Sequence, residues 1–596
     1  MKVTSLSLNN AQALRAGKWL HVPPGAAPVS TTVRVELVAP KDAFPEVLIT
    51  DPRRSLSWQV AMEPSSAEGW SAEILLPSEP TRLNYFFTLA DGQTIQERRQ
   101  LEGVSRPWYG VWTEQNFQLS VYQPEGDPPA WVRGQVVYQI FPDRFFKGDV
   151  PAASVMDRTY RHKRRYLKWD QSPEHPPKGR DFFGGNFPGV IEKLDYLQDL
   201  GITTLYFTPI FTSPTNHRYD TIDYHQVDPL LGTEADYREL VRQAQRRGMR
   251  VLLDAVFNHC SMDSLYFTSA RSSKTSPHYR WFNFRRWPDR WVGWEEVREM
   301  PEFVECPEVE DFFFGPQGVA QYWLERGAAG WRTDVTPWIT DDYWRRFHKA
   351  VRRDYPEAYL IAEDWGDATH RLLGDMFDAT MNYRFGYSVL GFAGGKLSPG
   401  ELDDRLETLR RETPPGQFQS QLNLIGSHDT ARALTSLGGD RRRLMLAVAL
   451  QLAYPGVPMI YYGDEAGLEG KYAEASRKAF PWGSEDPTLL DFYRTAIRTR
   501  RNSPALSLGE VETALIGEGP QGAYGFLRRC GQDLVLALFN SSLSTVIAEV
   551  ALGKDARPGA WTDLLGGEPA LLQAETLRVE LPPLGVGWYR QFPTGG

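Results

Sequence analysis

The sequence predicts an α/β protein: a (β/α)8 TIM barrel with a subdomain inserted after strand three, and a β-sandwich domain at each end. Eight short, almost continuously apolar segments in the middle of the chain alternate with helix-like segments. Residues 1–125 and 505–596 instead alternate apolar and polar residues between turn residues, which is typical of β-sandwich strands. A chain of 596 residues is also too long for a single hydrophobic core.

Residues 1–125 are predicted to form the N-terminal sandwich. Thr32–Ala39, Trp70–Leu76 and Leu83–Leu89 are short alternating segments separated by Pro, Gly and Asp residues. Such segments are expected to bury one face of each strand and expose the other. The segment Pro124–Pro129 is rich in Pro and predicts a linker to the barrel.

Residues 126–504 are predicted to form the barrel. Strands that are apolar on both faces are typical of parallel sheets covered by helices. The predicted strands are Val136–Phe141, Thr203–Pro209, Arg250–Phe257, Gly330–Val335, Tyr359–Asp364, Asp378–Tyr383, Gln421–Gly426 and Pro458–Asp464. The predicted helices are Val190–Leu200, Glu234–Arg247, Gln317–Arg326, Asp342–Asp354, Arg441–Leu452 and Leu489–Arg501.

Two connections in the barrel are longer than a helix and its loops require. The connection between strands three and four predicts an inserted subdomain at about residues 260–310, and the connection after strand one predicts a further insertion at 147–185. After residue 505 the alternating pattern returns, which predicts the C-terminal sandwich. Its predicted strands are Tyr524–Arg528, Leu534–Asn540, Thr545–Leu552 and Leu577–Leu581.

Composition excludes several classes of function. The net charge is −9, and the densest basic cluster, Arg161–Arg165, is typical of a solvated loop, so no nucleic-acid partner is expected. The three cysteines, Cys260, Cys306 and Cys530, are too far apart for a disulfide framework. Met1–Asn10 lacks the pattern of a signal peptide, and no segment approaches the ~20 apolar residues of a membrane helix. We therefore expect a cytoplasmic protein with no membrane partner.

Charged and hydrogen-bonding residues stand where the apolar strands end. They are Asp254 and His259 at strand three, Arg332 and Asp334 at strand four, Glu363 at strand five, and His428 and Asp429 after strand seven. The carboxyl ends of the strands form the active-site face of a TIM barrel. One such acid would be better explained as a structural ion-pair partner. Asp334, Glu363 and Asp429, three acids from three strands, together predict an active site.

Two carboxyl groups with different roles are what glycoside cleavage requires. In a retaining enzyme they lie ~5–5.5 Å apart, one ionised to attack the anomeric carbon and one protonated to assist the leaving oxygen. We expect Arg332 to lower the pKa of Asp334, which makes Asp334 the nucleophile. We expect burial and neighbouring carboxylates to raise the pKa of Glu363, which makes Glu363 the general acid/base. Asp429, His259 and His428 would hydrogen-bond the sugar hydroxyls.

These blocks resemble the four signature regions of glycoside hydrolase family 13, the α-amylase family. The blocks are Asp254–His259, Gly330–Asp334, Ala362–Trp365 and Ser427–Asp429, in the family's order. The resemblance covers essentially the whole chain. It implies that Asp334 is the nucleophile, Glu363 the acid/base and Asp429 the transition-state stabiliser. The implied substrate-binding residues are Arg332, His259, His428, Tyr219, Asp254, Trp365 and Arg477.

Within this family the chain resembles the neopullulanase, cyclomaltodextrinase and maltodextrin glucosidase group, whose members carry an extra, carbohydrate-binding-like N-terminal β-sandwich. Gln139–Phe145, Met381–Tyr383, Arg477–Trp482 and Trp365–Asp367 are most similar to bacterial maltodextrin glucosidases. The resemblance implies an oligosaccharide as the small-molecule partner. It also allows a homodimer through the N-terminal domain.

Three departures from the group bear on specificity and on metal binding. Trp338 follows the nucleophile where many members have polar residues, so it is expected to bind leaving-side sugars through an apolar face. Glu474 is displaced by one position from a carboxylate that usually binds the −2 sugar. Lys147–Pro151 replaces the usual calcium loop, and Asn258 is explained equally well by a calcium site or by a structural hydrogen bond. Because calcium prefers 6–8 oxygen ligands, no metal or other cofactor is expected to be required.

The predicted function is retaining hydrolysis of α-1,4 bonds in maltodextrins, with α-1,6 bonds as a further candidate. A cyclomaltodextrinase or neopullulanase acting on cyclic oligosaccharides, and an α-glucanotransferase with the same catalytic residues, are the alternatives within this chemistry. A non-catalytic carbohydrate-binding protein is an alternative from another class. Such a protein would typically lack one or more of the acids Asp334, Glu363 and Asp429, which are all present here.

Overall fold

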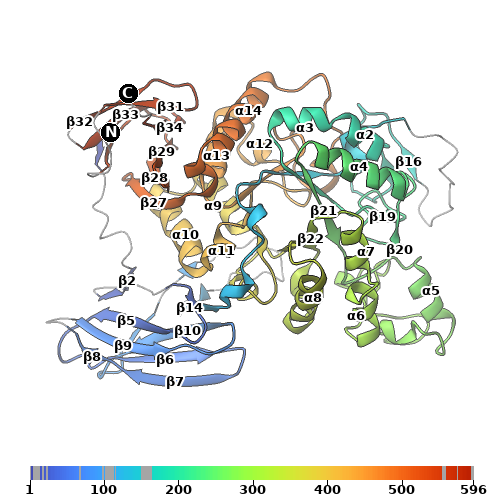
Figure 1. The fold of residues 1–596 in the computed structure, drawn as a ribbon, viewed down its shortest axis with the longest axis horizontal. Coiled ribbons are helices and arrows are strands. Elements are labelled where there is room, and N and C mark those ends of the chain that lie inside the picture. The colour runs from blue at the N-terminus through green and yellow to red at the C-terminus, as the bar shows by residue number, and fades with distance from the viewer. Residues whose placement is uncertain are drawn as a thin grey trace.

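The computed structural model describes residues 2–4, 14–16, 19–21, 25–65, 69–96, 99–100, 113–114, 116–149, 164–552, 559–573 and 575–591. Residues 1, 5–10, 150–151 and 161–163, discussed above, lie outside this set. A central barrel carries a β domain from each end of the chain, the N-terminal one in blue and the C-terminal one in red (Figure 1). The predicted fold class is confirmed.

Eight parallel strands form a closed barrel. In order they are β15 (Val137–Ile140), β18 (Thr204–Phe207), β21 (Arg250–Ala255), β22 (Gly330–Thr333), β23 (Tyr359–Ala362), β24 (Ala379–Asn382), β25 (Leu422–Leu424) and β26 (Val457–Tyr461). β15 pairs with β26 and closes the ring. Gly330 has φ +157°, and a Cβ there would lie 2.0 Å from the Tyr359 carbonyl oxygen, so only glycine permits this approach of β22 to β23.

Alternate side chains of each strand point into the barrel or toward the helices. Val137, Leu252 and Ile361 belong to the cluster inside the barrel. Tyr138 and Leu253, their neighbours in sequence, belong to the cluster that packs against the helices. This alternation fills the barrel with side chains and leaves its carboxyl-end face for polar groups. β22 and β23 end two residues earlier than predicted, because Asp334 and Glu363 lie just beyond the hydrogen-bonded ladder.

Helices surround the barrel, as predicted, and the structure adds further helices to the six that the sequence predicts. The helices are α1 (Pro142–Phe145), α2 (Phe187–Glu192), α3 (Leu194–Leu200), α4 (Glu234–Arg246), α5 (Leu265–Ser272), α6 (Pro307–Phe314), α7 (Val319–Glu325), α8 (Asp341–Asp354), α9 (Tyr383–Ala393), α10 (Pro399–Glu412), α11 (Pro415–Phe418), α12 (Ala433–Ser436), α13 (Arg441–Ala453), α14 (Pro487–Asn502) and α15 (Pro504–Leu508). The sequence did not predict α9 and α10. Between β23 and β24, all of which the structure describes, the chain forms no α-helix, only the 3-10 helix η7 (Thr369–Arg371).

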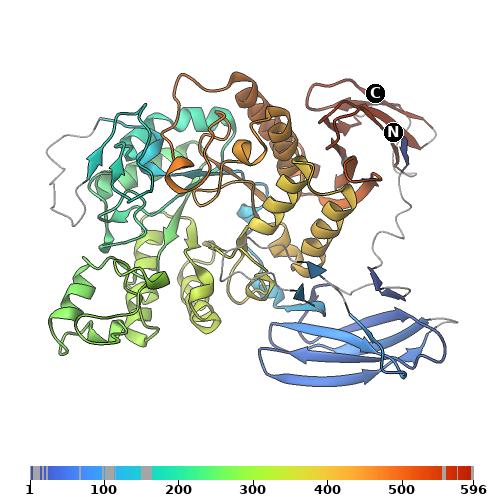
Figure 2. The ribbon, with the colours of Figure 1, turned by 180° about the vertical axis from the view of Figure 1, so that it is seen from behind.

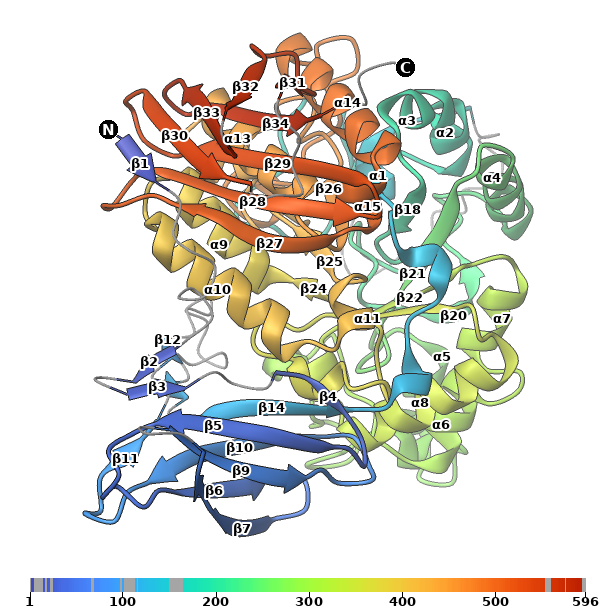
Figure 3. The same cartoon turned by 60° about the vertical axis from the view of Figure 1, so that its left-hand side comes forward.

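The N-terminal domain consists of two facing sheets around their own core (Figure 1). One sheet contains β4 (Ala27–Pro28), β14 (Phe117–Tyr122), β10 (Thr81–Thr88), β6 (Glu46–Asp51), β7 (Leu56–Ala61) and β11 (Thr94–Ile95). The other contains β2 (Leu14–Ala16), β3 (Trp19–His21), β5 (Thr32–Val38), β9 (Gly69–Leu75) and β8 (Glu63–Pro64). β14 and β4 lie directly below α11 (Figure 3). The homodimer through this domain stays a prediction.

The C-terminal domain is a nine-stranded sheet that packs on the α9–α15 side of the barrel (Figure 2). Its order is β1 (Lys2–Thr4), β30 (Val546–Ala551), β33 (Thr576–Leu581), β32 (Ala570–Gln573), β31 (Gly559–Asp563), β34 (Val586–Arg590), β29 (Asp533–Asn540), β28 (Ala523–Cys530) and β27 (Glu510–Ile516). β1 pairs in parallel with β30, so the start of the chain contributes to the sheet of its end.

The segment between β21 and α6 holds α5, two 3-10 helices, η4 (Tyr279–Trp281) and η5 (Trp294–Glu296), and isolated bridges, with no extended sheet. An aromatic cluster that includes Phe267, Trp281 and Trp291 packs it together. Across the described residues, no helix combines the length and apolarity needed to cross a membrane.

Candidate active site

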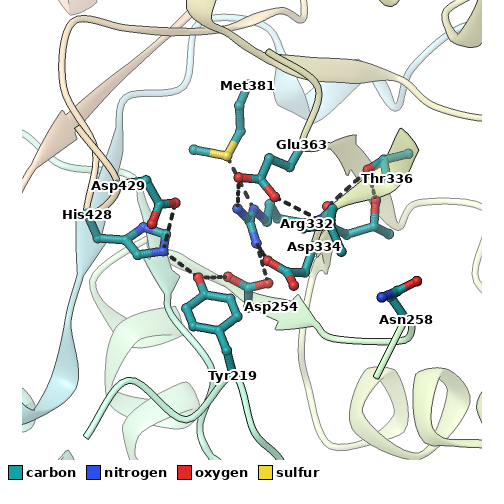
Figure 4. Close-up of polar contacts among 12 residues, drawn as sticks. Tyr219, Asp254, Asn258, Arg332, Asp334, Thr336, Glu363, Met381, His428 and Asp429 are labelled. Atoms are coloured by element: carbon teal, nitrogen blue, oxygen red, sulfur yellow. Dashed lines mark hydrogen bonds and ion pairs between the residues drawn. The ribbon is translucent and has the colours of Figure 1, made fainter. Parts of the chain in front are cut away.

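The centre of the site is the guanidinium of Arg332, which is fully buried at the end of β22. Its Nη1 lies 2.8 Å from Oδ1 of Asp334 and 2.8 Å from Oδ1 of Asp254, and its Nη2 lies 2.9 Å from Oε1 of Glu363. Its Nε contacts Sδ of Met381 at 3.3 Å. Carboxyl groups from three neighbouring strands, β21, β22 and β23, therefore converge on one cation (Figure 4).

Two further donors orient the carboxyl group of Glu363. The backbone N–H of Val335 donates to Oε2 at 2.7 Å, and the indole N–H of Trp365 donates to Oε1 at 3.1 Å. Val335 has φ +41°, a strained conformation for a β-branched residue, and this turn aims its N–H at Glu363. Oε1 also faces Arg332, whereas Oε2 accepts one donor. Oε2 is therefore the oxygen with room for a proton.

The predicted direction of the pKa shift of Asp334 is wrong. Burial raises the pKa of Asp334 well above its ordinary value, Arg332 opposes this, and the carboxyls of Glu363 and Asp254 raise the pKa further. Burial likewise raises the pKa of Asp254 to about 6 against the pull of Arg332. The physical reason is that one positive charge is shared among three buried carboxyl groups, which cannot all be ionised together.

We expect this shared charge to appear in the pH dependence of catalysis. A nucleophile must be ionised, so activity is lost as the pH falls through its pKa, and a raised pKa moves that loss toward neutrality. The acid limb of kcat/KM should therefore lie clearly above pH ~3.9, the value for an unperturbed Asp. Initial rates on maltotriose across the pH range measure it. An acid limb at the ordinary value would contradict the raised pKa.

A second hydrogen-bonded group faces this cluster from the loops after β18 and β25. The hydroxyl of Tyr219 lies 2.9 Å from Oδ2 of Asp254 and 2.6 Å from Nε2 of His428 (Figure 4). Oδ2 of Asp429 lies 3.1 Å from the same Nε2. Burial, Arg477 and Arg332 lower the pKa of His428 well below its ordinary value, so the ring is neutral. Gln139 Nε2 donates to its Nδ1 at 2.9 Å, which places the ring proton on Nε2.

Asp429 differs from the other acids in its exposure. Its side chain is 23% exposed, and Nη2 of Arg477 lies 3.2 Å from its Oδ1. Arg477 also donates to the His428 carbonyl oxygen at 2.8 Å, which fixes the two loops together. Asp429 is thus open to a ligand while Arg477 partly balances its charge.

His259 and Trp338 lie at the edges of the cluster. Burial lowers the pKa of His259 to about 3, so its ring is neutral, and it stacks on Trp294 of the inserted segment with centroids 5.4 Å apart. Its Nε2 has no hydrogen-bond partner among the described residues and can bind a ligand hydroxyl. Trp338, in η6 (Thr336–Trp338), is 41% exposed just after Asp334.

Two of the predicted substrate-binding residues, Asp254 and Trp365, contact other side chains of the protein. Asp254 accepts hydrogen bonds from Tyr206 and Tyr219 as well as facing Arg332, so it holds those side chains and does not face open space. The indole of Trp365 stacks on Tyr383, with centroids 4.0 Å apart, and donates to Glu363. These contacts show that both side chains hold their neighbours in place, and the predicted sugar contacts of Asp254 and Trp365 stay predictions.

Glu474 is also enclosed. It is 4% exposed, and its carboxylate faces Arg144 at 2.8 Å and Asn216 at 3.1 Å. Glu474, one position away from the usual carboxylate, therefore forms a structural ion pair with Arg144.

Asn258 is the residue for which the sequence allowed either a calcium site or a structural hydrogen bond. Its Nδ2 lies 3.3 Å from Nδ1 of His259, which fits the structural explanation. Among the residues that the structure describes, no group of three or more His, Cys, Asp or Glu side chains could hold a metal ion.

Sequence reasoning missed two donors that orient Glu363 and His428. Gln139 is the single polar residue in the apolar segment Val136–Phe141, and this isolated polarity could have indicated its contact with His428. The backbone N–H of Val335 carries no such signal, because it depends on φ alone.

The sequence of the chain was compared with protein families and with known proteins. Residues 139–503 match the family model described as alpha amylase, catalytic domain. The chain belongs to the α-amylase family. Neopullulanase 2 of Thermoactinomyces vulgaris is 34% identical over 584 residues, which cover 94% of this chain and 96% of that protein.

Two solved structures share the fold over most or nearly all of this chain. A cyclomaltodextrinase is 30% identical, with a TM-score of 0.72, over 96% of this chain and 99% of its own. The cyclic α-maltosyl-(1→6)-maltose hydrolase of Arthrobacter globiformis, in complex with cyclic α-maltosyl-(1→6)-maltose, is 32% identical, with a TM-score of 0.69, over 78% of this chain and 100% of its own. The chain spans 40%, 40% and 28% of the length of three amylopullulanases to which it is 34% identical.

Proposed function

We propose that this protein is a retaining glycoside hydrolase of α-glucans, with Asp334 as nucleophile and Glu363 as general acid/base. The observation that carries the proposal is the contact of one buried guanidinium, Arg332, with both carboxyl groups at the carboxyl ends of β22 and β23. Such a bridge holds the two groups near one another, and a retaining mechanism requires two carboxyl groups ~5–5.5 Å apart to act on one anomeric carbon.

The proposed reaction has two steps. Glu363 gives its proton to the glycosidic oxygen while ionised Asp334 attacks the anomeric carbon; the carbon–oxygen bond breaks and a glycosyl ester forms on Asp334. Glu363, now a carboxylate, takes a proton from water, and the water oxygen attacks the same carbon and releases Asp334. The guanidinium of Arg332 favours the ionised form of Asp334. The positive charge that develops on the sugar favours it in the same way.

The surrounding side chains would bind the reacting sugar. Asp429 is open to a ligand and can accept hydrogen bonds from ring hydroxyls. His428 is neutral with its ring proton on Nε2, so it can donate a hydrogen bond. His259 is also neutral, and its Nε2, which has no hydrogen-bond partner among the described residues, can bind a hydroxyl. The ring of Tyr219, fixed by Asp254 and His428, offers an apolar face. Sugar stacking on this face would exclude water from the carboxyl pair.

For the substrate we propose short maltooligosaccharides, cyclic ones included, with α-1,4 bonds as the principal target. The likeness to neopullulanase 2 and to a cyclomaltodextrinase over nearly the whole chain supports this more strongly than the motifs shared with maltodextrin glucosidases. A maltodextrin glucosidase stays the second candidate. It rests on the segments around Gln139, Met381 and Arg477.

A timed product profile on maltotriose, pullulan and β-cyclodextrin tests the proposal. Opening of the β-cyclodextrin ring before any shorter product appears is the expected result, with products released in the α-anomeric form by NMR. Glucose release from linear substrates without ring opening would favour the maltodextrin glucosidase. β-Anomeric products would contradict the retaining mechanism.

Trp338 gives a test of the leaving side of the site. We expect Trp338→Ala to lower the ratio of transglycosylation to hydrolysis about 2- to 12-fold, as loss of an aromatic contact worth ~0.5–1.5 kcal/mol would do. Product analysis at high maltotriose concentration measures the ratio. Trp338→Phe, which keeps an aromatic face, serves as the control and should retain most of it. An unchanged ratio in Trp338→Ala would remove Trp338 from acceptor binding.

A further inference from the structure

One buried carboxylate, that of Asp367, joins the N-terminal domain to the loop that follows β23. Its Oδ2 lies 3.2 Å from Nη1 of Arg82 and 3.3 Å from Nε2 of Gln118. Arg82 lies on β10 and Gln118 on β14, neighbouring strands of the N-terminal domain. The side chain of Asp367 is 7% exposed, so these contacts are largely shielded from water.

The other oxygen of Asp367 binds within the barrel. Oδ1 accepts from the backbone N–H of Thr369 at 3.1 Å and from its hydroxyl at 2.5 Å. Nη1 of Arg384, in the first turn of α9, lies 3.2 Å away. Although burial opposes it, Arg384 and Arg82 lower the pKa of Asp367 well below its ordinary value, so the group is an anion between two cations. One side chain thus links the N-terminal domain, the loop and α9.

This loop carries the acid/base and its donor. Asp367 follows Trp365 by two residues, and Trp365 donates to Glu363. The neighbour of Arg384, Tyr383, supports the indole by stacking. A displacement of Asp367 would therefore move Trp365 and, through the indole hydrogen bond, the carboxyl group of Glu363.

The loop also lacks the support that other loops of the barrel receive. It is followed by η7 and by no α-helix before β24, and β10 lies against η7. A cavity of about 20 Å³, roughly room for one water, lies beneath the loop, lined in part by Asp364, Thr369 and Tyr383. Beside this small space, Asp367 supplies polar contacts to the loop.

Further contacts attach the N-terminal domain to the same segment. The backbone N–H of Gln123 donates to the Leu373 carbonyl oxygen at 2.8 Å, and Arg53 lies 3.7 Å from Asp375. The N-terminal domain therefore contacts the segment between β23 and β24 at several points.

We propose that Asp367 is a positioning residue through which Arg82 and Gln118 hold the acid/base loop, so that the N-terminal domain of a chain supports turnover in its own active site. The inference rests on the function proposed above. Arg82 and Asp367 act through Trp365 and Glu363 and need not contact the sugar.

Arg82→Ala in the full-length chain tests the proposal. We expect kcat on maltotriose to fall roughly 10-fold, since small misplacements of catalytic groups have effects of this order, while KM changes less than about twofold. Asp367→Asn should have the same effect or a larger one. Arg82→Lys, which keeps the charge, should recover most of kcat. Arg34→Ala removes an exposed arginine of the same domain, which pairs with exposed Glu36, and should leave both constants unchanged.

Hydrogen–deuterium exchange separates failure of this inference from failure of the proposed function. In Arg82→Ala we expect faster exchange in residues 363–373 and unchanged exchange in the other barrel loops, whether or not the protein hydrolyses glucans. Unchanged exchange of that segment would overturn the inference, as would a kcat loss in Arg34→Ala equal to that in Arg82→Ala. A loss of kcat with no recovery in Arg82→Lys would also overturn it.

Discussion

Asp334→Asn should lose turnover by about 10⁴-fold or more, which is the scale on which removal of a covalent nucleophile acts. The amide cannot form the glycosyl ester, while Arg332, His428 and Tyr219 remain to bind the sugar. KM and the binding affinity for maltooligosaccharides should therefore change little. Steady-state kinetics on maltotriose and calorimetric titration of the variant measure the two quantities.

The stability of this variant provides an internal check on folding. Because the folded state raises the pKa of Asp334, the folded protein favours the neutral group, and the ionised group opposes folding once the pH exceeds its ordinary value. The neutral amide removes that cost. Asp334→Asn should thus unfold at a Tm no lower than the parent at pH 7.

Asp354→Asn, at the exposed end of α8, is the matched control and should leave kcat unchanged. Substantial kcat in Asp334→Asn would remove Asp334 from the nucleophile role. So would an equal loss of kcat in the Asp354 variant.

Arg332→Met should have the largest combined effect on stability and activity. It leaves three carboxyl groups in a buried cluster without their common cation, a change that costs about 3–5 kcal/mol where one partner of a buried ion pair is removed. Turnover should be lost as well, because Asp334 and Glu363 lose the group that holds them together. Denaturant unfolding and kinetics on maltotriose test both effects.

The destabilisation in Arg332→Met should depend on pH. At acid pH the freed carboxyl groups can take up protons, so the loss of stability should be smaller at pH 5 than at pH 7. Arg346→Met removes a half-exposed arginine of α8 and is expected to change stability little. A loss of stability independent of pH would show that the packing of the long side chain, and not its charge, is what the fold requires.

Local patterns in the sequence were sufficient for the architecture. Continuous apolar segments such as Val136–Phe141 and alternating ones such as Thr32–Ala39 each report how many faces of a strand are buried, and burial on one or two faces decides the layer to which the strand belongs. The acids at the ends of β22 and β23 were placed on one rim for the same reason, because parallel strands of a barrel end on the same side. Their identities, Asp334 and Glu363, come from the sequence alone.

The tertiary structure decided how charge and orientation are shared among those residues. Arg332 contacts carboxyl groups beyond its own strand, and Asp367 contacts Arg82, which lies 285 residues away in sequence. Trp365 is close to Glu363 in sequence, but the direction of its indole toward Glu363 depends on how the loop folds. Hydrogen bonds and pKa values depend on distances of a few ångströms and on burial, and neither quantity is encoded in spacing along the chain. The type of chemistry was therefore readable from residue order, while the support of the acid/base loop by the N-terminal domain required the folded molecule.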